Sequence, residues 1–423
     1  LTYDVTPLIR EGGTAIGALV GEGWYAGDLF MRKMASLKGA RPKLLGQLEL
    51  TYADGRVESV VTDGSWKGTD EGPIVASGYY HGEDYDARRE LGEWSVAGYD
   101  DSKWGAVKAR KIEAKPLLVP KRLATVREIE ELPAQSVKEI DPGVFVFDFG
   151  QNLVGYPAMK IPVKKDQVVR IRVAEMLEKD GSLYTENYRA SRAQAYYTPA
   201  KDGVIEWQPE LTFFGYRFVE ITGLPEGAKP DEAAVVSKVI HTNFEQLGSF
   251  DSSHEKLNQL QSNIRWGQKG NFIDVPTDCP QRDERLGWTG DAQVFLSTSM
   301  FNYGVHSFWT RWLESARDDQ APDGGIPWVI PEVKMGPPSP GWADVIVTAP
   351  WEVYVRTGDR RVLSDNFEAM KKWVGVYERD AKNLITSIKG FGDWLQPYAK
   401  QQRGDTPMEM IATAYFGRDA RIL

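Results

Sequence analysis

Along the first part of the chain, hydrophobic and polar residues alternate with the period of a β-strand. Up to about residue 245, short runs rich in Val, Ile, Tyr and Phe are separated by turn sequences such as EGG, ADG and KDG, a pattern typical of an all-β region. In the segment 47–68, Leu48 and Leu50 alternate with polar residues up to an Asp-Gly turn, and valines follow it. This segment predicts a β-hairpin. A second block of strand-like runs begins after the proline-bounded segment 115–121, so we expect two β-sandwiches in series.

The hydrophobic period changes to that of a helix from about residue 250. Ser252 and Glu255 have the spacing of a capping box and precede apolar residues at helical intervals, which predicts a helix start. The last helix is expected to begin at Pro407, with Thr406 as its N-cap. Between these two, the same spacing predicts helices at about 291–301, 305–319, 343–357 and 364–382.

The connections between these helices alternate in length. Long segments rich in Pro and Gly, at about 271–290, 320–342 and 383–406, are separated by short connections. Because alternate connections of sequential antiparallel helices lie at the same end, we expect the long loops to share one face and to carry the function. Six helices in such pairs resemble half of an (α/α)6 barrel. The predicted architecture is multidomain β + α: an N-terminal β-sandwich (1–115), a second β-sandwich (116–247) and the N-terminal half of an (α/α)6 barrel (248–423).

Charge and composition narrow the possible partners. With 51 Lys and Arg against 60 Asp and Glu, the net charge of -9 argues against nucleic acid and favours a neutral ligand. No stretch approaches the roughly 20 apolar residues of a membrane span. One cysteine and four scattered histidines offer no metal-ligand spacing, so no metal is expected. The chain starts at Leu1 without a signal-peptide pattern, so we expect the native N-terminus to be missing. The compartment, whether cytoplasm, periplasm or outside the cell, and the oligomeric state are left undetermined.

The first long loop combines carboxylates, arginines and an aromatic residue. A like charge raises the pKa of a carboxyl group and a neighbouring Arg lowers it, so such a cluster can divide acid and base roles. A solvated salt-bridge loop is the alternative, but the prolines, the close glycines and the shared face favour a functional site. Cys279 has no neighbouring His to activate it and is expected to be a packed thiol. The residues concerned are Asp278, Arg282, Asp283, Glu284, Arg285, Trp288 and Asp291.

Tryptophans extend this chemistry to the other long loops, which carry Trp328, Trp342 and Trp394. Trp309 and Trp312, by contrast, have helical spacing with apolar neighbours and are predicted to lie in the core. An indole face beside carboxylate and Arg side chains suits a sugar, because the C–H face of the sugar stacks on the ring and its hydroxyls take the hydrogen bonds. The sequence therefore predicts a carbohydrate ligand.

Bacterial α-L-rhamnosidases of glycoside hydrolase family 78 have a signature that resembles PTDCPQRDERLGWTGDAQVF (276–295). The resemblance continues in FDFGQNLVGY and TFFGYRFVEITG, which look like the central β-domain of that family, and in GEGWYAGDL, which looks like its N-terminal sandwich. PGWADVIVTAPWEVYVRTGD and GFGDWL resemble its barrel loops. The resemblance covers essentially the whole chain. It implies inverting hydrolysis of terminal non-reducing α-L-rhamnosyl groups in glycosides or polysaccharides, without a required cofactor.

The resemblance also implies roles for single residues. Glu284 matches the general acid, Asp278, Arg282, Trp288 and Asp291 match residues that hold the sugar, and Trp342 and Trp394 match aromatic walls. The general base of the family is a glutamate in the second half of the barrel, which we expect to lie beyond this sequence, so the chain by itself is expected to be inactive.

The resemblance also implies that the N-terminal sandwich (1–115) is like a carbohydrate-binding module and that the barrel is the catalytic domain. A related sandwich in this family can bind rhamnose with calcium, and GYYHGEDYDARRE (78–90) has acids and aromatics for such a site, with a solvated turn as the alternative. The functional alternatives are a non-catalytic carbohydrate-binding protein and an (α/α)6 glycosidase that acts on another sugar.

Overall fold

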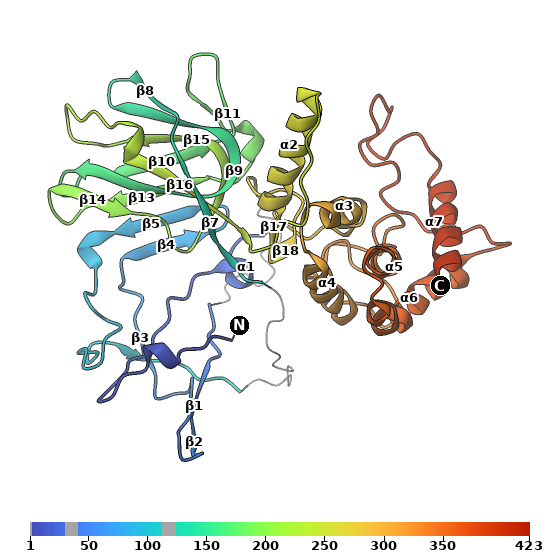
Figure 1. The fold of residues 1–423 in the computed structure, drawn as a ribbon, viewed down its shortest axis with the longest axis horizontal. Coiled ribbons are helices and arrows are strands. Elements are labelled where there is room, and N and C mark those ends of the chain that lie inside the picture. The colour runs from blue at the N-terminus through green and yellow to red at the C-terminus, as the bar shows by residue number, and fades with distance from the viewer. Residues whose placement is uncertain (1, 30–40, 112–123) are drawn as a thin grey trace. The chain divides into compact units, whose positions relative to one another are not determined.

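The computed structural model describes residues 2–29, 41–111 and 124–423 (Figure 1). The chain divides into two compact units. The first, built of strands, comprises Leu1–Lys121 and Glu131–Lys238, and the second, built mainly of helices, comprises Arg122–Glu130 and Val239–Leu423. The boundary falls within two strands, β7 (Val126–Pro133) and β16 (Val235–Thr242).

A sheet of ten strands dominates the first unit. Its strands follow the order β4-β5-β13-β10-β15-β9-β16-β7, and β14 and β8 also pair with β9. The long strand β9 pairs with several strands of this sheet, and its residues Phe147 and Ile161 are fully buried in the core of the unit. Besides β7 and β16, the sheet contains β4 (Ile74–Gly78), β5 (Gly82–Asp86), β8 (Ser136–Asp141), β9 (Val144–Val163), β10 (Val169–Ala174), β13 (Gln194–Thr198), β14 (Gly203–Trp207) and β15 (Phe214–Thr222).

Smaller elements complete the first unit. The predicted hairpin is confirmed, because β1 (Gln47–Thr51) pairs with β2 (Val57–Val61) in antiparallel register. Two further short pairs are formed by β3 (Lys67–Gly68) with β6 (Gly105–Ala106) and by β11 (Met176–Leu177) with β12 (Leu183–Tyr184). The short helices are η1 (Thr6–Leu8), α1 (Gly23–Ala26), η2 (Ala87–Arg89), η3 (Glu186–Tyr188) and η4 (Glu232–Ala234).

The two predicted sandwich regions are joined by one pairing. Strand β5, from the region 1–115, lies parallel to β13, from the region 116–247, with Gly82 opposite Gln194. Backbone hydrogen bonds thus cross from one region to the other, and most of both regions falls in a single compact unit. The division into domains at residues 115 and 247 therefore stays a prediction.

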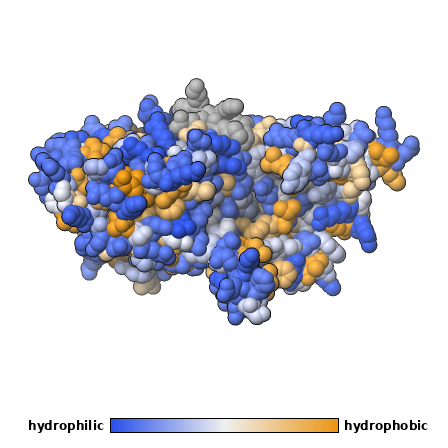
Figure 2. Space-filling view, turned by 90° about the horizontal axis from the view of Figure 1, so that it is seen from above, coloured by the Kyte–Doolittle hydropathy of each residue, from blue (hydrophilic) through white to orange (hydrophobic). Residues whose placement is uncertain are grey.

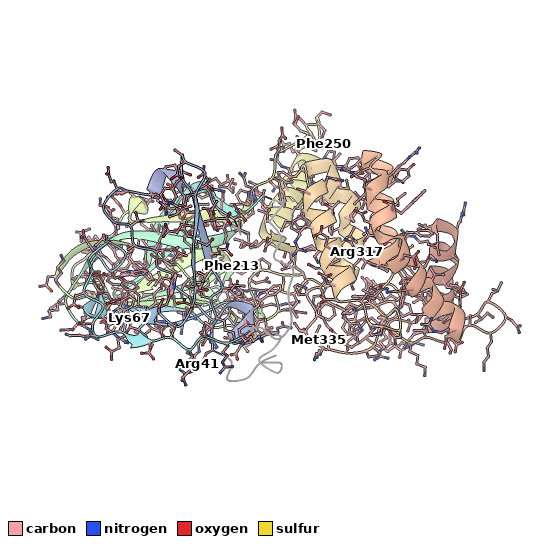
Figure 3. The ribbon with its side chains drawn as sticks, turned by 90° about the horizontal axis from the view of Figure 1, so that it is seen from below. Arg41, Lys67, Phe213, Phe250, Arg317 and Met335 are labelled. Atoms are coloured by element: carbon pink, nitrogen blue, oxygen red, sulfur yellow. The ribbon has the colours of Figure 1, made fainter. Side chains whose placement is uncertain are left out.

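The second unit consists of helices that pack in pairs. Helix α5 packs against α3, α4, α6 and α7, and α4 and α6 also pack against each other. In α4, Arg317 (labelled in Figure 3) donates a hydrogen bond of 2.6 Å to Asn366 Oδ1 in α6. The elements are α2 (Glu255–Asn271), β17 (Phe272–Ile273), β18 (Val275–Pro276), α3 (Thr289–Asn302), α4 (His306–Asp318), α5 (Val345–Thr357), α6 (Arg360–Asp380) and α7 (Met408–Ile422).

The helices agree closely with those predicted from the hydrophobic period, and Trp309 and Trp312 lie in the core as expected, at 0% and 2% exposure. Both predicted caps are wrong. Helix α2 has His254 at its N-cap, and Ser252 bonds instead with the Asn258 side chain. Helix α7 has Pro407 at its N-cap, because the Thr406 hydroxyl donates to Asp393.

Hydrophobic residues on the visible face in Figure 2 form small areas among hydrophilic ones. On α3, α5 and α7, several large apolar side chains are exposed, among them Val294, Phe301, Val355 and Met410. None of the helices in the described part of the chain is both long enough and apolar enough to span a membrane.

Candidate active site

The loop between β18 and α3 is closed by hydrogen bonds of its own. The Asp278 amide donates to the carbonyl of Leu286 over 3.0 Å, and the Leu286 amide donates to Asp278 Oδ1 over 3.0 Å. Arg285, which is 2% exposed and has a φ of 54°, donates to the carbonyl oxygens of Gln281 and Arg282. The buried guanidinium thus donates hydrogen bonds to two carbonyl oxygens of its own loop. These hydrogen bonds fix the loop in its closed form.

Arg282 is the centre of the acidic cluster. Its Nη2 atom lies 2.9 Å from Glu284 Oε2 and 3.7 Å from Asp278 Oδ2, and its Nε lies 3.3 Å from Cys279 Sγ. Glu284, which is 8% exposed, also accepts a hydrogen bond of 3.1 Å from Trp288 Nε1. The carboxyl group of Glu284 is therefore oriented by an arginine and by an indole.

Burial controls the proton affinities of this cluster. Desolvation, together with the charge of Glu284, raises the pKa of Asp278 to about 7. Asp291 lies in the first turn of α3 and exposes part of its side chain, yet desolvation of its carboxylate still raises its pKa. Burial also raises the pKa of the Cys279 thiol, so that this residue stays protonated and unreactive. Asp278 can therefore hold a proton near neutral pH.

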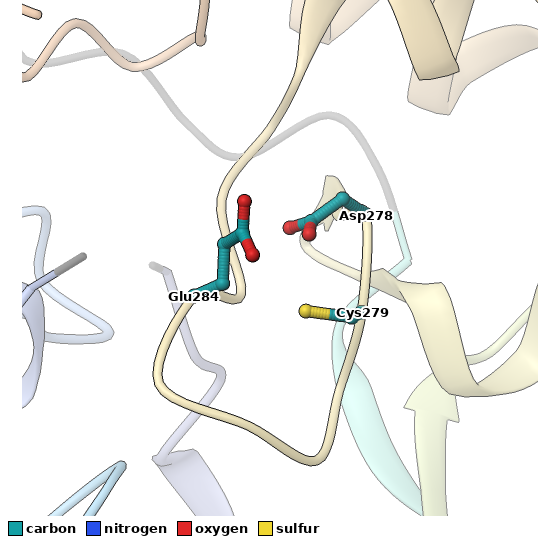
Figure 4. Close-up of side chains that lie close together, drawn as sticks. All are labelled: Asp278, Cys279 and Glu284. Carbon is teal, nitrogen blue, oxygen red and sulfur yellow. The ribbon is translucent and has the colours of Figure 1, made fainter. Parts of the chain in front are cut away.

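The side chains of Asp278, Cys279 and Glu284 point into a common space (Figure 4). Their donor atoms lie within 4.8 Å of one another, and no other group of this kind has metal-binding spacing in the part of the chain that the structure describes. A metal would need the thiolate form of Cys279, whereas burial favours the thiol. The Arg282 guanidinium already places a positive charge against all three residues. The prediction that the site holds no metal remains a prediction.

Aromatic rings from all three long loops gather beside the acidic cluster, with Phe391 among them. The ring centroid of Phe391 lies 4.6 Å from that of Trp342, 4.7 Å from Trp328, 5.3 Å from Trp394 and 5.9 Å from Trp288. Trp288 and Trp328 stack with an interplanar angle of 14°. These contacts confirm the expectation that the long loops share one face.

Close backbone approaches hold the first two loops together. The Thr289 amide donates to the Trp328 carbonyl, and the Ile330 amide donates to the Gly287 carbonyl, both over 2.9 Å. A Cβ atom on Gly287 would lie 2.1 Å from the Ile330 carbonyl oxygen, so only glycine permits this contact. A Cβ atom on Gly290 would similarly lie 2.6 Å from the Trp342 indole. These two glycines therefore allow the second loop to approach the first closely.

The structure brings most of the predicted site residues together. Asp278, Arg282 and Glu284 form the cluster, Trp288 contacts Glu284, and Trp342 and Trp394 meet through Phe391. The charge of Glu284 also acts on Asp291. Asp283, expected to be structural, is 1% exposed. Phe391 was not singled out from the sequence, because an aromatic residue in a glycine-rich loop gives no local sign of the rings it contacts.

A pair of buried carboxyl groups lies among the helices. Asp344 Oδ1 accepts hydrogen bonds from Trp373 Nε1 (3.1 Å) and Tyr377 Oη (2.9 Å), and its Oδ2 accepts one from the Gly341 amide. Trp373 Nε1 also lies 3.2 Å from Asp419 Oδ2. Burial and the Asp344 charge raise the pKa of Asp419, so it keeps its proton at neutral pH. Asp344 thereby anchors the end of the second long loop at Gly341.

Two acids of the segment 78–90, Glu83 and Asp86, have structural partners. Glu83, 1% exposed, accepts hydrogen bonds from the amides of Glu210 and Leu211. Asp86 accepts from the backbone and guanidinium of Arg88. Calcium binding in this segment remains a prediction.

Models of three bacterial α-L-rhamnosidase domains match successive parts of the chain. They are the alpha-L-rhamnosidase N-terminal domain at residues 1–130, the bacterial alpha-L-rhamnosidase concanavalin-like domain at 138–241 and the bacterial alpha-L-rhamnosidase 6 hairpin glycosidase domain at 245–423. The fold and the site thus define a β-domain protein with a helical-hairpin glycosidase domain, which confirms the predicted fold class. The chain belongs to the bacterial α-L-rhamnosidase family, as its sequence indicated.

Proteins similar to this chain carry that name. An alpha-L-rhamnosidase of Formosa agariphila is 46% identical over 425 residues, which are 100% of this chain and 46% of that protein. One of Alteromonas sp. (strain LOR) is 44% identical, over 100% of this chain and 46% of that protein. The crystal structure of Streptomyces avermitilis alpha-L-rhamnosidase complexed with L-rhamnose matches with a TM-score of 0.88 at 41% identity, over 95% of this chain and 38% of that chain. The chain spans about half the length of the curated relatives it matches.

Proposed function

We propose that the whole protein is an inverting glycoside hydrolase that releases terminal non-reducing α-L-rhamnose from glycosides or polysaccharides. The observation that carries this proposal is the position of Glu284, which is held by Arg282 and Trp288 beside a group of aromatic rings. Support comes from the relatives named alpha-L-rhamnosidase and from the similar structure solved with L-rhamnose.

In the proposed reaction, Glu284 is the general acid. Its carboxyl group protonates the glycosidic oxygen as the bond from this oxygen to the anomeric carbon breaks, and a water molecule attacks that carbon from the opposite face. A carboxylate that acts as base takes a proton from this water. Inversion requires the two carboxyl groups to be roughly 6.5–9.5 Å apart, whereas the Asp278 and Glu284 donor atoms lie within 4.8 Å. Asp278 is therefore not proposed as the base, which we assign to another part of the whole protein.

The other residues of the site are proposed to bind the sugar. Arg282 and the carboxylates of Asp278 and Asp291 offer hydrogen-bond partners for hydroxyl groups, and charged partners make the stronger hydrogen bonds. Trp288, Trp342 and Trp394 offer indole faces for the apolar side of the ring. Rhamnose lacks the hydroxyl group at C6, so its methyl group suits such an aromatic wall.

Substitution of Glu284 by Gln in the whole protein tests the acid role. The variant should lose far more turnover on a rhamnoside with a poor leaving group, roughly 100-fold or more, than on an activated aryl rhamnoside, since only the former needs protonation. Glu368→Gln is a matched control on α6, where the side chain is 76% exposed, and it should change neither rate. Equal losses on both substrates would remove Glu284 from the acid role.

A further inference from the structure

We infer that Phe391 is a positioning residue, whose ring sets the orientation of the Trp288 indole and thereby of the Glu284 carboxyl group. The inference rests on the proposed function of Glu284 and extends it to the third long loop. Phe391 has no polar side-chain atom, so it acts through its contacts with other rings.

The first observation is that Phe391 contacts tryptophans from all three loops. Its ring lies edge-on to Trp288, Trp328 and Trp394, at interplanar angles of 71°, 62° and 74°. It is tilted by 47° against Trp342. Edge-to-face contacts have a preferred geometry, because the positive edge of one ring meets the negative face of another. A shift of the Phe391 ring would therefore disturb several indoles together.

The second observation is that the backbone of Phe391 is fixed. Its amide donates a hydrogen bond of 3.0 Å to Ser339 Oγ. Ser339 belongs to the second loop, is 1% exposed, and donates from the same oxygen to the Pro340 carbonyl over 3.1 Å. The ring thus belongs to the third loop, and the hydrogen bond to Ser339 of the second loop fixes its position. Because its backbone is fixed, Phe391 can keep the neighbouring rings in place.

The third observation connects the ring to the acid. Trp288 packs against both Trp328 and Phe391, and its Nε1 donates to Glu284 Oε1 over 3.1 Å. Because the indole is rigid, a rotation of the ring moves Nε1 and breaks this hydrogen bond. A general acid must lie within hydrogen-bond reach of the leaving oxygen, and small displacements cost large factors in rate. Loss of the Phe391 ring should therefore weaken protonation more than binding.

The test compares Phe391→Leu with Phe391→Tyr, which keeps the ring, in the whole protein. Phe391→Leu should lower kcat on a rhamnoside with a poor leaving group by roughly 10- to 100-fold, with a smaller loss on an activated aryl rhamnoside and a KM change below about 3-fold. Phe391→Tyr should restore kcat to within about 3-fold of the native value. Phe367→Leu, at a phenylalanine that is 42% exposed on α6, is the matched control and should change neither constant.

A spectroscopic measurement keeps the inference separate from the proposed activity. In protein labelled with 5-fluorotryptophan, the ¹⁹F signal of Trp288, assigned with Trp288→Phe, should shift in Phe391→Leu and return in Phe391→Tyr. This measurement holds even if the native protein releases no rhamnose, an outcome that would overturn the proposed function alone. An unchanged Trp288 signal, or equal losses on both substrates, would overturn the positioning role. If Phe391→Leu does not fold, Phe391→Met takes its place.

Discussion

Replacement of Arg282 by Met would test whether the guanidinium holds the acidic cluster together in the absence of any ligand. The substitution keeps an unbranched chain about as long as the aliphatic part of Arg but removes the cation that lies beside two largely buried carboxyl groups. The side chains of Asp278 and Glu284 are 8% and 10% exposed, and that of Arg282 is 37% exposed. We expect the variant to be less stable, with a loss that depends on pH.

The magnitude follows from the distances. At 2.9 Å, the separation of Arg282 Nη2 from Glu284 Oε2, two unit charges attract with about 1.5 kcal/mol in bulk water and about 6 kcal/mol at an effective dielectric constant of about 20. Removal of one partner of a buried pair costs roughly 3–5 kcal/mol, and the partial exposure of Arg282 reduces this figure. We therefore expect a loss of about 2–3 kcal/mol in the free energy of unfolding at pH 8.5.

The pH dependence has a definite sign. Asp278, whose pKa is raised to about 7 in the folded protein, ionises at about pH 4 when unfolded. Below pH 7 it keeps its proton in the folded native protein and in the variant alike, so Arg282 contributes little through it. Above pH 7 the native protein ionises Asp278 against the guanidinium, whereas the variant lacks this partner. The loss should shrink to about 1 kcal/mol at pH 5.5.

Urea unfolding followed by tryptophan fluorescence at pH 5.5 and 8.5 measures both values. Arg311→Met is a matched control, since Arg311 is 39% exposed and pairs with Glu314 at 3.5 Å on α4. It should change stability by less than about 0.5 kcal/mol at either pH. A loss for Arg282→Met that is equal at both pH values would refute the titration of Asp278 against the guanidinium and leave the pair with Glu284 and the packing of the side chain as its causes.

Two further variants probe the positions of the aromatic and carboxyl groups. Gly290→Ala should weaken inhibition of the whole protein by free L-rhamnose by at least 10-fold, because a Cβ atom would lie 2.6 Å from the Trp342 indole; unchanged inhibition would contradict the packing argument. The control is Gly417→Ala on α7, where a Cβ atom meets nothing within 4 Å, and it should leave inhibition unchanged and stabilise the helix by up to about 1 kcal/mol. Asp419→Asn should stabilise the protein by about 1–3 kcal/mol at pH 8 and by little at pH 4, because the raised pKa of Asp419 makes the folded state lose stability as pH rises above the ordinary carboxyl value. Urea unfolding checks this, with the exposed Asp365→Asn as control, and a stabilisation of the same size at pH 4 would exclude titration as its cause.

The cluster of the first loop could be predicted because its members are close in sequence. Asp278, Arg282, Glu284 and Trp288 belong to one short loop, and their contacts with one another require only that this loop closes. The common face of the three long loops was also predictable, because the alternation of long and short connections fixes it for sequential antiparallel helices. Local pattern was enough in both cases.

Local pattern failed where a polar side chain had competing partners. Thr406 has the type and position of an N-cap residue, but its hydroxyl bonds to Asp393 in the third loop. Ser252 and Glu255 have the spacing of a capping box, but the amide and the hydroxyl of Ser252 both donate hydrogen bonds to Asn258 Oδ1. A capping sequence indicates that a side chain is able to accept a hydrogen bond from the first turn of the nearest helix. The surrounding structure decides which hydrogen-bond partner it takes.

The sequence by itself determined the helices, the hairpin at 47–68, the acidic cluster and the family, because each depends on residues that are near one another in the chain or on a contiguous signature. Only the tertiary structure decided that β5 pairs with β13, that Phe391 contacts four tryptophans, and that Asp344 and Asp419 form a buried pair. Periodicity records which face of an element is buried, but it does not record which distant element covers that face. The partners of Phe391 and Asp419 are set by how loops and helices pack, and therefore their roles become visible only when the chain is folded.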